Sequence, residues 1–220
     1  IRDHCVTGVQ TCALPIWYGV AVLMRGHRPP DARVGPGRAD DGARDSMNVL
    51  RAVVVMGVSG SGKTVVGREL AARLGWRFRD ADEFHPPANV ERMSRGIPLT
   101  DDDRGPWLDR LHDLVGGALS EGGEPIVLAC SALARRYRER MGLGRGGVRL
   151  VFLDGPREVI RGRIAARRDH FMPASLLDSQ LAALEPPEPA ERPIVASIEG
   201  TPGEIAAGIV AALGGGSDDA

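Results

Sequence analysis

Eight residues between positions 57 and 64 have the types and spacing of a phosphate-binding loop. They read Gly57-Val58-Ser59-Gly60-Ser61-Gly62-Lys63-Thr64, which is glycine, four residues, glycine, lysine and a hydroxyl residue. In such a loop, backbone N–H groups wrap the phosphate oxygens, and the N-terminus of the following helix adds positive potential. We expect Lys63 to reach the β- and γ-phosphates of ATP, and the hydroxyl of Thr64 to bind Mg²⁺.

Lys63 is also the only lysine of the chain, because 27 of the 28 lysines and arginines are arginines. A lysine is a compact point charge on a flexible stem, whereas an arginine is a planar fork. The one lysine therefore stands where this phosphate chemistry requires it. GTPases that read guanine through Asn-Lys-x-Asp need a second lysine, and the Leu-Ser-Gly-Gly-Gln signature of transporter ATPases is absent. Small kinases are the main class that remains.

Asp80 and Asp82 follow the next apolar segment and are two residues apart. If both extend a strand, their side chains point the same way, into the crevice at the carboxyl end of a parallel sheet. Asp80 is then expected to hold Mg²⁺ through water, and Asp82 to orient or deprotonate an acceptor hydroxyl. The alternative is an ordinary solvated loop.

The segments around these residues alternate between strand and helix patterns. Apolar runs predict strands at 52–56, 76–80, 125–129, 148–153 and 194–198. Helical patterns cover 63–74 and the stretch from Trp107 to Leu119, and further helices are expected from Pro156 and, through a capping box, from 202 to about 213. This order predicts an α/β fold, with a five-stranded parallel sheet covered by helices on both faces.

Composition narrows the class of protein further. The net charge is −1 and aromatic residues make up 4% of the chain, which disfavours a nucleic-acid partner. Cys5, Cys12 and Cys130 have neither disulfide-framework density nor metal-ligand spacing, so a cytoplasmic setting is expected. Cys130 ends a buried strand with no base beside it and is expected to be inert.

The two ends of the chain differ from the rest. Residues 1–46 show no helical or strand period, and the string from Val6 to Ile16 resembles translated sequencing-adapter sequence. We expect this segment to be artefactual or disordered, with a kinase domain at 47–214 and a flexible tail at 215–220. A genuine disordered extension is the alternative.

Beyond the phosphate loop, the chain resembles the gluconokinase family over about residues 50–213. The matching motifs are Asp80-Ala81-Asp82 with His85-Pro86, Gly96-Ile97-Pro98-Leu99, Asp101-Asp102-Asp103-Arg104, Pro106-Trp107-Leu108, Cys130-Ser131-Ala132-Leu133 with Arg136, Tyr137 and Arg138, the lid residues Arg163, Arg167, His170 and Phe171, and Gln180 with Leu184-Glu185-Pro186. The resemblance implies a P-loop fold like that of nucleoside-monophosphate kinases, with an arginine-bearing lid, and a homodimer. It implies transfer of a phosphoryl group from ATP to D-gluconate, giving 6-phosphogluconate. No membrane partner is expected, because the apolar run from Cys12 to Met24 is too short to span a bilayer, and no nucleic acid is expected at a net charge of −1.

A sugar acid needs cations for its carboxylate and polar groups for its hydroxyls. The residues expected to bind it are Asp82, His85, Arg104, Ser131, Arg136 and Arg138, since arginine suits bidentate carboxylate binding. Arg163 and Arg167 are four residues apart and share a helix face, so they are expected to lie over the transferring phosphoryl group as catalytic residues. For each of these arginines the alternative is a solvated surface charge.

Two other functions stay open. The first is a kinase for another small hydroxy acid such as shikimate, although shikimate kinases carry a glycine triplet where this chain has Ala129-Cys130-Ser131-Ala132. The second is a nucleotide-binding protein without turnover, in which case the paired aspartates and the lid arginines would have no purpose.

Overall fold

The computed structural model describes residues 49–95, 97–166 and 174–214. The predicted catalytic residue Arg167, the lid residues His170 and Phe171, the segment 1–46 and the tail 215–220 lie outside the described residues. No helix in the described part of the chain is long and apolar enough to cross a membrane.

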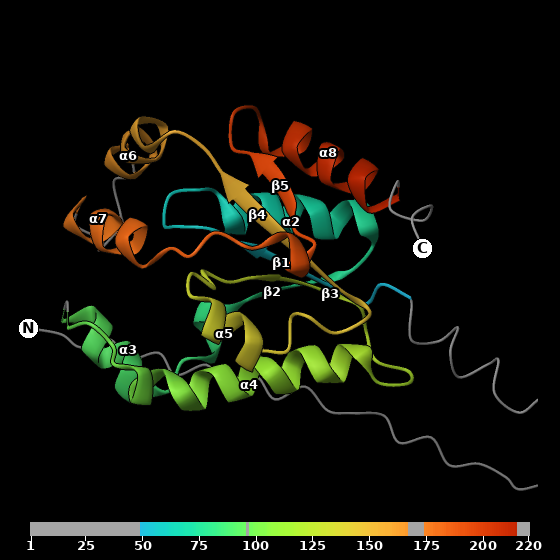
Figure 1. The fold of residues 1–220 in the computed structure, drawn as a ribbon, viewed down its shortest axis with the longest axis horizontal. Helices are drawn as coiled ribbons and strands as arrows, with labels where there is room; N and C mark the ends of the chain where they lie inside the picture. Colours follow the sequence, from blue (N-terminus) through green and yellow to red (C-terminus); the bar gives the residue numbers. More distant parts are fainter. Residues whose placement is uncertain (1–48, 96, 167–173, 215–220) are drawn as a thin grey trace, which may run out of the picture. The chain divides into compact units, whose positions relative to one another are not determined.

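The described residues form a five-stranded parallel sheet in the order β2-β3-β1-β4-β5 (Figure 1). The strands are β1 (Ala52–Met56), β2 (Arg77–Asp80), β3 (Ile126–Ala129), β4 (Val148–Asp154) and β5 (Ile194–Ser197). All five predicted strands are confirmed, with ends that differ by at most one residue. The central strand β1 is buried along its whole length, as expected for a strand covered on both faces.

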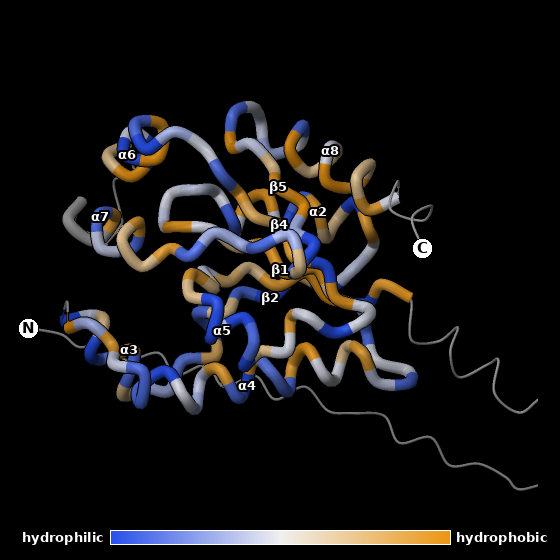
Figure 2. The backbone as a smooth tube through the Cα atoms, in the orientation of Figure 1, coloured by the Kyte–Doolittle hydropathy of each residue, from blue (hydrophilic) through white to orange (hydrophobic). Residues whose placement is uncertain are grey.

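Side chains of β1 alternate between two hydrophobic clusters, one on each face of the sheet. Val54 and Met56 pack on one side with Leu108 and Leu111 of α4 (Asp101–Leu119), on the face that also carries α5 (Arg135–Arg140). Val55 packs on the other side with residues of α2 (Lys63–Leu74) and α8 (Pro202–Gly214). Figure 2 shows apolar residues gathered in the central strands and spaced along the sheet-facing sides of these helices.

The helix ends follow from local signals. Helix α2 begins and ends at glycines in the left-handed region, Gly62 (φ 100°) and Gly75 (φ 68°), the second of which is a common helix stop. Helix α8 begins at the predicted capping box, in which Thr201 and Glu204 exchange hydrogen bonds. Helix α4 begins at Asp101, earlier than its apolar stripe, because Thr100 and Asp103 form a second capping box.

Short polar elements carry no apolar period, and sequence patterns did not predict them. They are the 3₁₀ helices η1 (Ala81–Phe84) and η2 (Pro189–Glu191), with α3 (Pro87–Ser94) and α5. Helix α6 (Arg157–Ala165) begins after Pro156, as predicted, and α7 (Ala174–Ala183) follows it in the chain. Helices α3, α6 and α7 lie beyond the carboxyl ends of the strands (Figure 1), where parallel sheets bind ligands.

Candidate active site

The phosphate loop connects β1 to α2 and is built around backbone geometry. A Cβ atom at Gly57 would lie 2.8 Å from Ser61 Oγ and 2.9 Å from the carbonyl oxygen of Leu153, so a side chain has no room there. Gly60 (φ 85°) and Gly62 (φ 100°) adopt the left-handed region, which favours glycine. Gly62 contributes no side-chain cap to α2, so the first N–H groups of this helix face the loop as anion donors.

Two residues at the start of α2 connect this loop to its surroundings. The Nζ atom of Lys63 donates to the carbonyl oxygen of Val58 at 3.0 Å, which brings the ammonium group back across the loop. The hydroxyl of Thr64 donates to Oδ2 of Asp80 at 3.0 Å. The predicted metal-binding pair is therefore brought together at the carboxyl edge of the sheet.

Asp82 lies close to this pair, but not for the reason expected from the sequence. Strand β2 ends at Asp80, and Asp82 lies in the 3₁₀ helix η1, so the alternation of side chains along a strand does not apply to it. Asp80 caps η1 instead, because its Oδ1 accepts a hydrogen bond from the N–H of Asp82 at 3.2 Å. The two carboxylates thus stay adjacent through a capped turn, and Asp82 is exposed.

The buried thiol of Cys130 lies near these charged groups. Burial, together with the nearby carboxylates of Asp82 and Asp80, raises the pKa of Cys130 to about 12, against the lowering effect of Lys63. The thiol therefore stays protonated, in agreement with its predicted inertness. Next along the chain, the carbonyl oxygen of Ser131 accepts a hydrogen bond from the N–H of Gly57 at 3.4 Å, so Ser131 borders the phosphate loop.

His85, a predicted substrate-binding residue, forms a stacked pair with Trp107. Their ring centroids are 4.4 Å apart and the rings are 10° from parallel. The indole of Trp107 is fixed by its hydrogen bond of 2.7 Å to the carbonyl oxygen of Ala81 in η1. Burial, and then the positive charge of Arg104, lower the pKa of His85 to about 4, so the imidazole is neutral at neutral pH.

Four side chains from α4 and α5 form a second polar cluster, defined here as the arginine–tyrosine cluster. The carboxylate of Asp101 lies 3.5 Å from Arg104 and 3.1 Å from Arg136. It also accepts a hydrogen bond from the hydroxyl of Tyr137, which is the largest cause of its lowered pKa. Arg104 and Arg136 both donate to the Tyr137 oxygen, at 3.3 and 3.2 Å. Two predicted substrate-binding arginines thus converge on one carboxylate.

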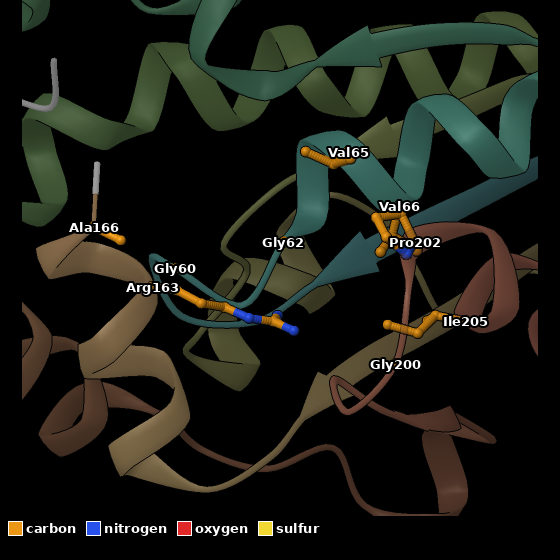
Figure 3. A pocket seen from close by; sticks show the side chains of 9 residues that line it. All are labelled: Gly60, Gly62, Val65, Val66, Arg163, Ala166, Gly200, Pro202 and Ile205. Atoms are coloured by element: carbon orange, nitrogen blue, oxygen red, sulfur yellow. The ribbon is translucent and has the colours of Figure 1, made fainter. Parts of the chain in front are cut away.

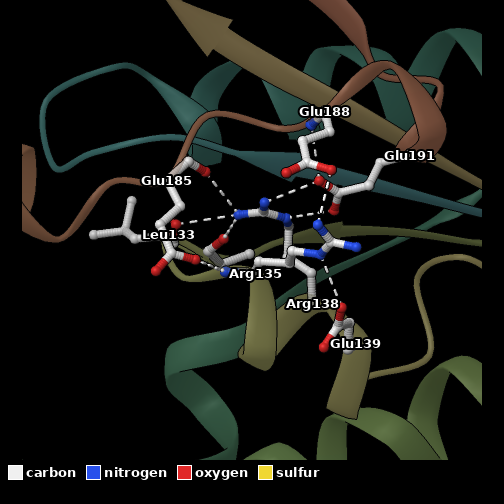
Figure 4. A network of polar contacts seen from close by, with 8 residues as sticks. Leu133, Arg135, Arg138, Glu139, Glu185, Glu188 and Glu191 are labelled. Atoms are coloured by element: carbon white, nitrogen blue, oxygen red, sulfur yellow. Dashed lines mark hydrogen bonds and ion pairs between the residues drawn. The ribbon is translucent and has the colours of Figure 1, made fainter.

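Arg138 has a different role from the one predicted. Its side chain is 1% exposed, and all three of its guanidinium nitrogens donate to the protein (Figure 4). The acceptors are both carboxylate oxygens of Glu191 and the carbonyl oxygens of Ala132, Leu133 and Glu185. Arg138 therefore has no open edge for a ligand and instead fixes the β3–α5 loop that carries Ser131.

Arg163 connects the phosphate loop to the residue that follows β5. Its guanidinium donates to the carbonyl oxygens of Ser61, at 3.4 Å, and Ile198, at 2.7 Å. These two contacts fix Arg163 beside the phosphate loop, and its role over the transferring phosphoryl group stays a prediction.

A cavity of about 390 Å³ lies beside the loop, and Arg163 forms one wall of it (Figure 3). The remaining lining is mainly small and apolar and comes from the loop, α2, the end of α6 and the start of α8: Gly60, Gly62, Val65, Val66, Ala166, Gly200, Pro202 and Ile205. An apolar cavity with one planar cation suits a flat, partly apolar group more than a phosphate.

Comparisons with known proteins agree with this geometry. A family model described as an AAA domain matches residues 53–187, which is more than half of the chain. A gluconokinase of Gluconobacter oxydans is 52% identical over 137 residues, which are 62% of this chain and 76% of that protein. The chain belongs to the gluconokinase family.

Solved structures support this membership. A gluconokinase from Sinorhizobium meliloti is 42% identical, with a TM-score of 0.67 over 76% of this chain and 93% of that one. A shikimate kinase from Acinetobacter baumannii is 21% identical, with a TM-score of 0.51 over 80% of this chain and 99% of that one, and shows a shared fold only.

Three residues of this gluconokinase-family site were not assigned roles from the sequence, although they lie in its motifs. Trp107 positions His85, while Asp101 and Tyr137 complete the arginine–tyrosine cluster. Asp101 stands in a run of three aspartates, and Tyr137 stands between arginines, so composition alone ranks neither above its neighbours. Only the packing of α4 against α5 selects them.

Proposed function

We propose that this protein is an ATP-dependent gluconokinase that phosphorylates D-gluconate at its terminal hydroxyl, giving 6-phosphogluconate and ADP. The observation that carries the proposal is the hydrogen bond between Thr64 and Asp80. It joins the phosphate loop to the carboxyl end of β2, where η1 begins. Helix η1 contains Asp82, and its Ala81 carbonyl oxygen holds the Trp107 ring that stacks on His85. Donor and acceptor machinery therefore meet at one edge of the sheet, in a chain that belongs to the gluconokinase family.

The nucleotide would bind along the phosphate loop. Its phosphates would contact the loop N–H groups and Lys63, and its base would enter the apolar cavity beside Arg163. The hydroxyl of Thr64 and the carboxylate of Asp80 are oxygen ligands of the kind that Mg²⁺ takes, with the phosphates and water completing its shell. When bound, the ion would neutralise charge on the β- and γ-phosphates.

The acceptor would be held at both ends. Its carboxylate would pair with Arg104 and Arg136, replacing Asp101, the carboxylate that these arginines contact in the structure. Its hydroxyls would meet His85, Ser131 and Asp82. As the terminal hydroxyl oxygen bonds to the γ-phosphorus, the bond from that phosphorus to the β,γ-bridging oxygen breaks, and Asp82 takes the hydroxyl proton.

An assay of ADP release tests this function and both alternatives. The purified chain is mixed with ATP and Mg²⁺, alone and with D-gluconate or shikimate. We expect release to depend on D-gluconate and the product to be 6-phosphogluconate. Release that depends on shikimate would replace the proposal with the first alternative. ATP binding without release under any condition would replace it with the second.

The homodimer stays a prediction, which a measurement of the molecular mass of the protein in solution tests. The cytoplasmic setting also stays a prediction.

A further inference from the structure

One side chain from a distant part of the chain contacts the phosphate loop directly. The N–H group of Ser59, the third residue of the loop, donates to Oε1 of Gln180 in α7 at 2.6 Å. The two residues are 121 positions apart in the sequence. A loop built to offer N–H groups to phosphate thus has one of them occupied by a side-chain amide. The nucleotide and acceptor contacts proposed above give this amide no role.

Helix α7 holds Gln180 in place through its apolar side and its end. Leu177 is 1% exposed and belongs to the core cluster that includes Val53 and Val55 of β1. Beyond the helix, the N–H of Glu185 donates to the carbonyl oxygen of Leu133 at 2.9 Å, and the carbonyl oxygen of Glu185 accepts from the buried Arg138. The amide therefore extends from an anchored helix.

The contact lies where the terminal phosphate of ATP would be. Lys63 reaches the β- and γ-phosphates in loops of this kind, and its Nζ atom is 3.0 Å from the carbonyl oxygen of Val58. Val58 precedes Ser59, so the segment that Gln180 contacts borders the position of the γ-phosphate. Because Oε1 is engaged with Ser59, the NH₂ group of the same planar amide lies at the same place. No other hydrogen-bond partner of Gln180 is found within residues 49–95, 97–166 and 174–214.

We propose that Gln180 is a further ligand of the transferring phosphoryl group. Its Oε1 fixes the amide on Ser59, and its NH₂ group donates to a γ-phosphate oxygen, which ADP lacks. Gln180 would therefore distinguish ATP from ADP and stabilise the charge of the γ-phosphoryl group during transfer. This inference rests on the proposed function, because it takes ATP as the phosphoryl donor.

The variant Gln180→Glu separates the two halves of the amide. A carboxylate of the same length still accepts from Ser59, but it cannot donate to phosphate and it repels the γ-phosphate charge. Isothermal titration should show ADP affinity within about twofold of the wild type and ATP affinity at least about tenfold weaker, which is the usual size for a hydrogen bond to a charged group. The kcat with D-gluconate should fall by about 10²-fold, as for loss of one preorganised donor.

The variant Ala182→Glu is the matched control, because it adds the same charge to the same helix at an exposed position. It should keep wild-type ATP affinity, ADP affinity and kcat. The proposal is overturned if Gln180→Glu keeps wild-type ATP affinity and kcat. It is equally overturned if the two nucleotides lose affinity to the same extent, since Gln180 would then only support the loop.

A second variant covers the case in which Gln180→Glu does not fold. Gln180→Met keeps the length of the side chain but removes both the donor and the acceptor. We expect a larger loss of affinity for ATP than for ADP, whereas an unchanged ratio of the two would overturn the proposal. The binding test needs no acceptor. If wild-type protein binds ATP but does not phosphorylate D-gluconate, the proposed function fails while the Gln180 proposal is still tested.

Discussion

The phosphate loop and the arginine–tyrosine cluster, the two anion sites that we propose, are built in opposite ways. The loop is one continuous stretch between a fully buried strand and a helix, and its glycines aim backbone groups. The cluster is made of side chains from two helices, and they are held mainly by one another, with Arg136 59% exposed. A backbone site is fixed before its ligand arrives, whereas in the proposed function the cluster would exchange Asp101 for the acceptor carboxylate. The loop should therefore set the rate of transfer, and the cluster should set affinity for the acceptor.

The largest effect is expected at Asp82, which follows Asp80 in η1. Asp82→Asn keeps the shape of the side chain but removes its charge and basicity, so kcat should fall about 10²–10⁴-fold. ATP affinity should change little, because the phosphate loop is untouched. Steady-state kinetics with D-gluconate and Mg²⁺ varied separately measure this effect.

The matched variant Asp80→Asn should mainly shift the dependence of the rate on Mg²⁺, since Asp80 pairs with Thr64. If Asp82→Asn kept its turnover and only the Mg²⁺ dependence moved, the two roles would have to be exchanged.

Lys63 tests whether the loop sets the rate. Lys63→Ala should lower kcat by about 10²-fold or more, because it removes a charge that tracks the γ-phosphate. Lys63→Arg should also be poor, since a planar fork does not replace a compact ammonium inside this loop. Measured kcat values near that of the wild type in both variants would contradict the assignment.

Arg136 and Arg138 sharpen the comparison because they stand two residues apart and differ in burial. Arg138→Met leaves Glu191 and three carbonyl oxygens without their donor, so it should lower the free energy of unfolding by about 3 kcal/mol or more. Arg136→Met removes an exposed ion pair with Asp101 and a hydrogen bond to Tyr137, so it should change stability much less than Arg138→Met while raising KM for D-gluconate. Urea unfolding and kinetics on both variants would contradict this contrast if Arg136→Met were the less stable protein.

His85 gives the acceptor side a pH dependence. Its pKa is lowered to about 4 in the folded protein, from an ordinary value of 6.5, so unfolded chains bind a proton that folded chains do not. His85 therefore does not lower the free energy of unfolding above pH 6.5. As pH falls from 6.5 towards 4, protonation favours the unfolded chain and the free energy of unfolding decreases. After allowance for partial exposure, the loss at pH 5 should be on the order of 1 kcal/mol.

The control is His85→Phe, which keeps a ring on Trp107 but cannot titrate. As pH falls from 6.5 towards 4, the wild type should lose unfolding free energy relative to the variant. Above pH 6.5 the difference between the two proteins should stay constant. A difference that stays constant between pH 7 and pH 5 would show that the shift in pKa is small.

The smallest effect is expected from residues 1–46. A chain that starts at Met47 should match the full chain in Tm and in kcat, because this segment adds no periodic pattern to the core. A lower Tm or a lower kcat of the shortened chain would show that residues 1–46 contribute to stability or to activity.

The sequence by itself determined the sheet, the phosphate loop and the identity of most motif residues. These features are local, because a buried strand needs a continuous apolar run and the loop needs glycines at fixed spacing. The pairing of Thr64 with Asp80 was also predictable, since parallel strands end at the same edge of a sheet.

The tertiary structure alone decided which arginines are open to a ligand. Arg104, Arg136, Arg138 and Arg163 look alike in a chain that is rich in arginine, and burial and partners follow from contacts between residues far apart in the sequence. Arg138 is enclosed by acceptors up to 53 positions away, and Arg163 contacts the phosphate loop 102 positions before it. The hydrogen bond from Ser59 to Gln180 arises in the same way, because only the packing of α7 on the core brings that amide to the loop.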